Sequence, residues 1–194
     1  MKNLHQYITQ NAKNHLIFDF DETIAKLVID WTDWHIGVHK ILQKYEPEHK
    51  LHPHGEYLFV NQFIRKYGIQ VSQEIENFSQ AYELQSLKSV KPNPEIIDLI
   101  YQMSERPEKK LFIYSSNSKK TIDLGLQKIG LDSTIFAQIV TRTEVSLIKP
   151  DPEGFYLIYD ETVPKEKYLM IGDSSSDEGV AEAAGIDFWR VEYF

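Results

Sequence analysis

The stretch Leu16-Ile17-Phe18-Asp19-Phe20-Asp21-Glu22-Thr23 decides the fold. Its apolar run, about residues 16 to 20, is typical of a strand that is buried on both faces of a parallel sheet. Two carboxylates follow one residue apart, and a hydroxyl group comes next. Because a buried carboxylate is costly unless something compensates it, Asp19 and Asp21 indicate a cation or a phosphate group at the end of this strand.

Further apolar runs follow downstream, and segments of helical periodicity separate them. The predicted strands are Leu111–Tyr114, Ile139–Val140, Tyr168–Ile171 and Ile186–Val191. Strands that alternate with helices are typical of a parallel sheet with right-handed crossovers. We therefore predict an α/β fold with a Rossmann-like parallel sheet.

Residues 29–90 break this alternation. Their apolar residues recur at helical spacing, and Pro47, Pro53, Gly55 and Gly68 separate the helical segments. We predict a small helical subdomain at 29–90, inserted into a core made of residues 1–28 and 91–194. We also expect a short amphipathic helix within residues 1–14 that packs against the core.

Composition excludes several classes of function. The chain has 194 residues, a formal net charge of -8 and no cysteine, so disulfides and thiolate zinc sites are excluded. The acidic balance argues against a broad nucleic-acid or anionic-membrane surface. No apolar run approaches membrane-spanning length, and residues 1–15 lack the apolar core of a signal peptide. We therefore expect a cytoplasmic protein without nucleic-acid or membrane partners.

Polar side chains follow three of the predicted strands, and a lysine lies on a loop nearby. These residues are Asp19, Asp21, Ser116, Asn117, Lys149, Asp173 and Asp177. Ligands of open α/β sheets bind at the carboxyl ends of the strands, so these side chains meet if their strands are neighbours. Carboxylate oxygens suit Mg²⁺, whereas a hydroxyl, a lysine and backbone N–H groups form a cradle for an anion.

These motifs resemble the haloacid dehalogenase (HAD) superfamily of hydrolases, in its phosphatase branch. The matching pieces are Asp19–Thr23, Ser116-Asn117, Lys149–Pro152 and Gly172–Ser174 with Asp177, and they occur in the family's order. The resemblance covers about residues 16–189, with the helical insert at the position of the family's C1-type cap. It implies a HAD-like core in which the first strand lies between the second and the fourth.

The resemblance also implies roles for the carboxylates. Asp19 would be the nucleophile that becomes an aspartyl phosphate, and Asp21 would be the general acid and base. Asp19, the backbone carbonyl of Asp21 and Asp173 would hold Mg²⁺, and Asp177 would ligate or orient that site. The family often has glycine after the second aspartate, whereas this chain has Glu22, which places the loop geometry in question.

The same resemblance assigns the phosphate site and the reaction. Ser116 and Lys149 would hold the phosphoryl group, with Asn117 beside them. The function implied is a Mg²⁺-dependent phosphatase that acts on a small phosphorylated metabolite. A phosphomutase or phosphotransferase with the same nucleophile stays open as an alternative. A non-enzymatic phospho-receiver or binding protein is disfavoured by the large insert, and carbon–halogen hydrolysis by the presence of Asp21.

Two groups of residues in the insert have less definite roles. The histidines are interpreted as surface or cap residues, with a zinc site as the less favoured alternative because it would normally need a more definite ligand set; they are His35, His39, His49, His52 and His54. The aromatics, Trp31, Trp34, Tyr57, Phe59 and Phe63, are expected mainly in the core, with at least one touching substrate. The segment Asp30 to His35 is our choice for substrate specificity. Oligomeric state is not indicated by any of these patterns.

Overall fold

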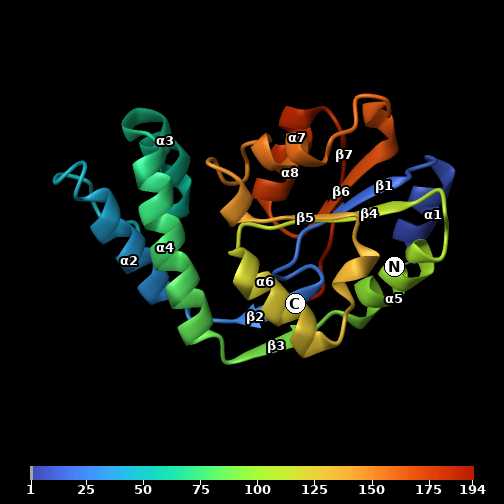
Figure 1. Cartoon of the computed structure of the whole chain (residues 1–194), viewed down its shortest axis with the longest axis horizontal. Coiled ribbons are helices and arrows are strands. Elements are labelled where there is room, and N and C mark those ends of the chain that lie inside the picture. The colour runs from blue at the N-terminus through green and yellow to red at the C-terminus, as the bar shows by residue number, and fades with distance from the viewer. Residues whose placement is uncertain (1) are drawn as a thin grey trace.

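Five parallel strands form the centre of the molecule (Figure 1). The computed structural model describes residues 2–194, with side chains from Leu4 onward. The sheet order is β5-β4-β1-β6-β7, and the strands are β1 (His15–Phe18), β4 (Lys110–Tyr114), β5 (Gln138–Val140), β6 (Tyr168–Gly172) and β7 (Asp187–Arg190). The predicted α/β class is confirmed, and β1 lies between the second and fourth predicted strands, as the resemblance implied.

Alternation of side chains along β1 builds two cores, one on each face of the sheet. Leu16 and Phe18 point into one core, and Ile17 points into the other. All three side chains are fully buried. Residue 17 pairs with Phe112 of β4 and with Met170 of β6, so the central strand is hydrogen-bonded on both sides.

Helices cover both faces of the sheet (Figure 1). The first core lies under α1 (Lys2–Gln10), α5 (Pro94–Ser104) and α6 (Lys119–Ile129), and the second lies under α7 (Glu153–Ile158) and α8 (Ser175–Ala184). The expected N-terminal helix is confirmed, since Leu4 and Ile8 of α1 are fully buried in the first core. Among the described residues, no helix is long and apolar enough to span a bilayer.

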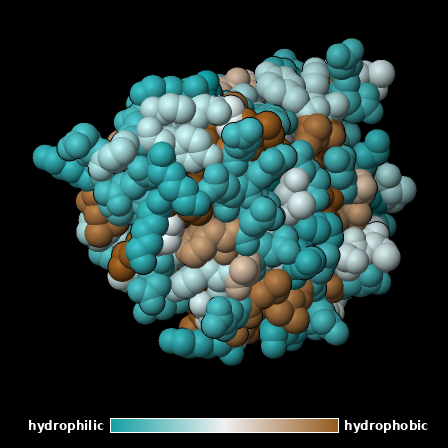
Figure 2. Space-filling model, turned by 60° about the vertical axis from the view of Figure 1, so that its left-hand side comes forward, coloured by the Kyte–Doolittle hydropathy of each residue, from teal (hydrophilic) through white to brown (hydrophobic). Residues whose placement is uncertain are grey.

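The segment between β2 (Ala25–Val28) and β3 (Ser89–Pro92) contains three helices that share a core of their own. They are α2 (Trp31–Leu42), α3 (Tyr57–Tyr67) and α4 (Ile69–Ser86), and Ile148 of the sheet domain joins their apolar cluster. Figure 2 brings the side of these helices forward, and hydrophilic side chains cover most of that face. The helical spacing predicted within residues 29–90 therefore corresponds to helices in the structure.

One element differs from the prediction. Ala25–Val28 (β2) and Ser89–Pro92 (β3) form a two-stranded antiparallel ladder, with Ala25 opposite Pro92 and Val28 opposite Ser89. Neither segment is among the predicted strands. β3 is short and largely exposed, so it carries no period-2 apolar pattern, and its partner is far away in the sequence. The ladder lies where the helical segment joins the sheet domain. The predicted boundaries of the inserted subdomain, at 28/29 and 90/91, stay predictions.

Candidate active site

The carboxyl ends of β1, β4 and β6 meet at one edge of the sheet, and the loop after β5 brings a lysine to the same place. Lys149 Nζ lies 2.6 Å from Asp19 Oδ1 and 2.5 Å from Asp177 Oδ1, and it donates to the carbonyl oxygen of Tyr114 at 3.0 Å. Lys149, Asp19 and Asp177 are all buried. One ammonium group is therefore shared by two buried carboxylates.

The carboxylates of the site carry more negative charge than this lysine offsets. Burial raises the pKa of Asp19, against the opposing effect of Lys149, and burial also raises the pKa of Asp21 to about 7 and that of Asp173 to about 6. Burial alone would lower the pKa of Lys149, but the charges of Asp177 and Asp19 outweigh it and hold that pKa above its usual value. The site is therefore electrostatically suited to a second cation.

The donor set fits magnesium. Carboxylate oxygens of Asp19, Asp173 and Asp177 lie within 4.8 Å of one another. Adjacent ligands of an octahedral Mg²⁺ lie roughly 3 Å apart, and the ion takes hard oxygen donors while keeping several waters. Both oxygens of Asp177 already accept hydrogen bonds, one from Lys149 and the other from Ser174. Asp19 and Asp173 are therefore the better ligands, and Asp177 suits an orienting position.

The start of α8 fixes Asp177. Ser174 and Asp177 form a capping box, in which Ser174 N donates to Asp177 Oδ2 at 3.1 Å and Ser174 Oγ accepts from Asp177 N at 3.3 Å. A Cβ atom on Gly172 would lie only 2.4 Å from the Asp177 carboxyl carbon. Only glycine at the end of β6 therefore lets this carboxylate approach the lysine.

A tight turn positions Asp21. Its Oδ1 accepts a hydrogen bond from Leu27 N at 2.7 Å, and Glu22 N donates to the carbonyl oxygen of Ala25 at 2.9 Å. Glu22 has φ +59°, in the left-handed region that favours glycine. Glycine adopts this conformation without strain, whereas Glu22 adopts it while pairing with Lys26 at 2.6 Å.

A cavity of about 440 Å³ collects the predicted site residues. Its lining includes Asp19, Asp21, Ser116, Asn117, Lys149 and Asp173. Asp177 is not part of the lining and lies behind it, fully buried. The structure thus brings together all seven of the polar residues predicted for the active site, and their chemical roles stay predictions. The volume is within the usual range for small-molecule sites, about 300–1,000 Å³.

The opposite wall of this cavity comes from α2, α3 and α4. Trp31, Trp34, His35, Tyr57, Val60 and Ile75 line it. Phe63 instead lies in the core of the three helices, and Phe59 packs against His52 with ring centroids 4.5 Å apart. Part of the expected specificity segment, Asp30 to His35, therefore faces the cavity, whereas two of the five aromatics do not.

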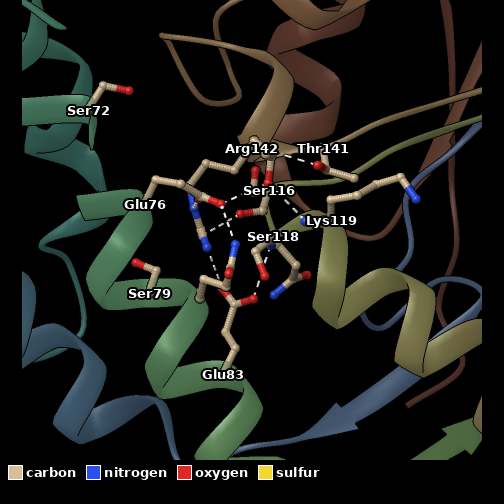
Figure 3. Close-up of polar contacts among 12 residues, drawn as sticks. Ser72, Glu76, Ser79, Glu83, Ser116, Ser118, Lys119, Thr141 and Arg142 are labelled. Atoms are coloured by element: carbon tan, nitrogen blue, oxygen red, sulfur yellow. Dashed lines mark hydrogen bonds and ion pairs between the residues drawn. The ribbon is translucent and has the colours of Figure 1, made fainter. Parts of the chain in front are cut away.

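Arg142, which the sequence analysis did not single out, joins the helical segment to the site (Figure 3). Its guanidinium lies 2.6 Å from Glu76 Oε2 and 2.7 Å from Glu83 Oε1, both on α4, and it donates to the carbonyl oxygen of Ser116 at 2.6 Å. Glu83 is fully buried and also accepts from Ser118 N at 3.0 Å. This network holds the loop after β4, where the predicted phosphate-binding residues lie.

Arg142→Met is expected to lower the free energy of unfolding by about 3–5 kcal/mol, because it leaves the fully buried Glu83 and the partly buried Glu76 without their cation. Urea titration followed by circular dichroism measures this change. The matched control is Arg65→Met, which removes a largely exposed arginine that pairs with Asp151 at 2.5 Å, and it should cost about 0–1 kcal/mol. Equal losses in the two variants would contradict the role assigned to the buried network.

Comparisons with known proteins agree with this architecture. The sequence model of a family described as haloacid dehalogenase-like hydrolase matches residues 16–191. A comparison with curated proteins finds no match.

Three solved structures share the fold. CbbY from Rhodobacter sphaeroides, in complex with phosphate, is 18% identical with a TM-score of 0.61, covering 94% of this chain and 87% of its own. A Lactobacillus plantarum protein assigned as a phosphoglycolate phosphatase is 22% identical with a TM-score of 0.56, covering 91% and 84%. YfnB from Bacillus subtilis, assigned as a HAD hydrolase and bound to magnesium, is 18% identical with a TM-score of 0.52, covering 91% and 85%.

Proposed function

The chain belongs to the haloacid dehalogenase-like hydrolases, and we propose that it is a Mg²⁺-dependent phosphatase that hydrolyses a small phosphorylated metabolite through an aspartyl phosphate on Asp19. The observation that carries this proposal is the contact of Lys149 with Asp19 inside a cavity that Ser116 and Asp173 also line. A carboxylate nucleophile, a cation and a hydroxyl group at one place are what transfer of a phosphoryl group requires.

In this mechanism Asp19 attacks phosphorus, and the bond between phosphorus and the leaving oxygen breaks. Asp21 gives a proton to that oxygen, since burial raises its pKa to about 7 and lets it hold a proton near neutral pH. Asp21 then takes a proton from the water that attacks the aspartyl phosphate, which releases inorganic phosphate and restores Asp19. Lys149 and Ser116 stabilise the charge on the phosphoryl oxygens.

Asp19, Asp173 and the backbone carbonyl of Asp21 would hold Mg²⁺, with Asp177 orienting the site. Support comes from the oxygen donors within 4.8 Å and from a fold relative that binds magnesium. When bound, the ion offsets the negative charge that would otherwise keep an anionic nucleophile away from a phosphate ester.

The α2–α4 segment acts as the cap, with residues 29–90 closing over a core of residues 1–28 and 91–194. The cap supplies the aromatic wall of the cavity, including Trp31, Trp34 and Tyr57. Closure excludes water while the aspartyl phosphate forms. Substrate specificity is then set by this wall.

A panel of phosphate esters tests the proposal. The purified protein should release inorganic phosphate from at least one small ester in the presence of Mg²⁺ and none in EDTA. Sugar phosphates in the panel separate a phosphatase from a phosphomutase with the same nucleophile, because a mutase yields an isomeric sugar phosphate with little free phosphate. No turnover of any ester by folded protein would contradict the proposal.

Magnesium should also stabilise the protein without substrate. At a free concentration ten times its Kd, Mg²⁺ is expected to raise the Tm by about 3–5 °C. Asp173→Asn should abolish this shift, because it removes a ligand. Asp98→Asn, a change at an exposed position on α5, should retain it. Differential scanning calorimetry measures both variants, and an undiminished shift in Asp173→Asn would contradict the assigned ligand.

A further inference from the structure

A second group of metal-binding side chains lies among α2 and α3, apart from the active-site cavity. It consists of His39 on α2, His49 in the connection between the helices, and Glu56 directly before α3. One ligand atom of each residue lies within 4.8 Å of those of the other two. None of the three lines the cavity that holds Asp19.

Glu56 is the centre of this group. Its side chain is fully buried, a position that is costly for a carboxylate without compensation. One oxygen lies 2.9 Å from His49 Nε2, and the other accepts from the backbone N of His52 at 2.7 Å. Although Glu56 stands at the N-terminus of α3, its side chain makes no capping hydrogen bond there. The carboxylate is directed at the histidines instead.

His39 offers a ring nitrogen that makes no hydrogen bond within the described part of the chain and is therefore available as a ligand atom. His39 Nδ1 is buried and has no hydrogen-bond partner among the described residues, although Glu56 Oε1 lies 3.4 Å away. Buried polar atoms are nearly always partnered, so this nitrogen calls for an explanation. Two donors bound to one tetrahedral zinc ion at about 2.0–2.1 Å lie roughly 3.3 Å apart. The separations of 3.4 Å between His39 Nδ1 and Glu56 Oε1 and of 2.9 Å between His49 Nε2 and Glu56 Oε2 are close to that value, so one carboxylate oxygen faces each histidine.

We propose that His39, His49 and Glu56 bind Zn²⁺, with the fourth position open to water. Two imidazoles and one carboxylate form a ligand set typical of zinc, whereas Mg²⁺ prefers the oxygen donors of the active site. The oxygen site therefore suits Mg²⁺, and the histidine site suits Zn²⁺. For these two histidines, this assignment favours the zinc alternative over the interpretation as surface or cap residues.

The positions of the three side chains indicate what a bound ion would do. Zinc held by them would link the last turn of α2, the connection 43–56 and the start of α3. Connections of about 12–15 residues without helix or strand are uncommon, and such a link would order this one. His35 lies one turn before His39, and Tyr57 directly follows Glu56; both line the active-site cavity. Zinc at this site would hold in place the wall on which they lie.

Equilibrium dialysis of the full chain tests the proposal. The protein is stripped with EDTA and then dialysed against Zn²⁺ with Mg²⁺ in large excess, which occupies the oxygen site. We expect a single zinc ion per chain, and a Tm rise of about 5–10 °C when free Zn²⁺ reaches a hundred times its Kd. Wild-type protein that retains no zinc and shows no shift would overturn the proposal.

Matched variants locate the ion. His39→Gln, His49→Gln and Glu56→Gln should each lose the zinc and the Tm shift. His54→Gln, which removes an exposed histidine, and Asp173→Asn, which removes an active-site carboxylate, should keep both. Zinc that is lost with Asp173→Asn and kept in His49→Gln would place the ion in the active site and overturn the assignment.

A spectroscopic test needs no variant. Wild-type protein loaded with Co²⁺ in excess Mg²⁺ should give the intense visible bands of a tetrahedral ion, and added Zn²⁺ should remove them. Only the weak bands of an octahedral ion would show that Co²⁺ occupies the oxygen site, and would contradict the proposal even if the histidine variants fail to fold.

Discussion

Asp19→Asn is expected to lower kcat/KM for every phosphate ester that the wild-type protein hydrolyses by at least about 10⁴-fold, because an amide cannot form the acyl phosphate. The side chain keeps its size, and Lys149 keeps its contact with Asp177 at 2.5 Å, so the fold should persist. Phosphate release under saturating Mg²⁺ measures the loss, and circular dichroism confirms the structure.

The matched control for this change is Asp98→Asn, which alters an exposed carboxylate on α5. It should leave kcat/KM within about twofold of the wild type, as expected for a surface position away from the site. Wild-type activity in a folded Asp19→Asn protein would exclude Asp19 as the nucleophile, and the proposed reaction would then need a different attacking group.

Lys149→Met should damage both activity and stability. Loss of the ammonium group removes a positive charge from the phosphoryl site, and removal of one such electrostatic group typically costs about 10²–10³ in kcat. It also leaves Asp19 and Asp177 buried without their shared cation, which is expected to lower the free energy of unfolding by about 3–5 kcal/mol in EDTA. Phosphate release and urea titration measure the two effects.

A double variant separates these two effects of Lys149. Adding Asp177→Asn to Lys149→Met should recover part of the stability, because one of the two unpaired charges is gone, while activity stays low. Lys120→Met, at an exposed position on α6, is the control and should change neither quantity appreciably. Full stability in Lys149→Met alone would show that the buried ion pairs do not hold the site together.

Local patterns were sufficient to predict most of the sheet and its helices. Leu111–Tyr114 and Tyr168–Ile171 lie within β4 and β6, because buried parallel strands are continuous apolar runs. Pro94 is at the first turn of α5, and Gly130 ends α6 in the left-handed conformation. The predicted first strand extended to Phe20, whereas β1 ends at Phe18. Phe20 is fully buried in the turn that follows, and an apolar residue in the sequence does not reveal whether it is buried in a strand or in a turn.

Features that depend on distant partners could not be predicted in this way. The β2–β3 ladder pairs residues 25–28 with residues 89–92. β2 alternates between buried and half-buried residues over only four positions, and the largely exposed β3 has no alternating pattern. The role of Arg142 could not be predicted for the same reason. Glu76 and Glu83 are seven residues apart and lie on one face of α4, but nothing local connects them to an arginine after β5.

The active-site residues were accessible to sequence reasoning for a different reason. Each lies directly after a buried strand or in a recognisable motif, so the parallel topology alone brings them to one edge of the sheet. The lining of the cavity by Asp19, Ser116, Lys149 and Asp173 agrees with that reasoning. Orientation within the helical segment is harder to predict, because aromatic residues at helical spacing face either the core, as Phe63 does, or the cavity, as Trp31 does.

Chemical trapping of the phosphoenzyme tests the central proposal most directly. Protein turning over a phosphate ester with Mg²⁺ is quenched in acid and reduced with borohydride, which converts an acyl phosphate of aspartate to homoserine, and the digest is examined by mass spectrometry. We expect homoserine at position 19 in a substrate-dependent amount. Homoserine at another aspartate, or none during continued release of phosphate, would contradict a reaction that passes through Asp19.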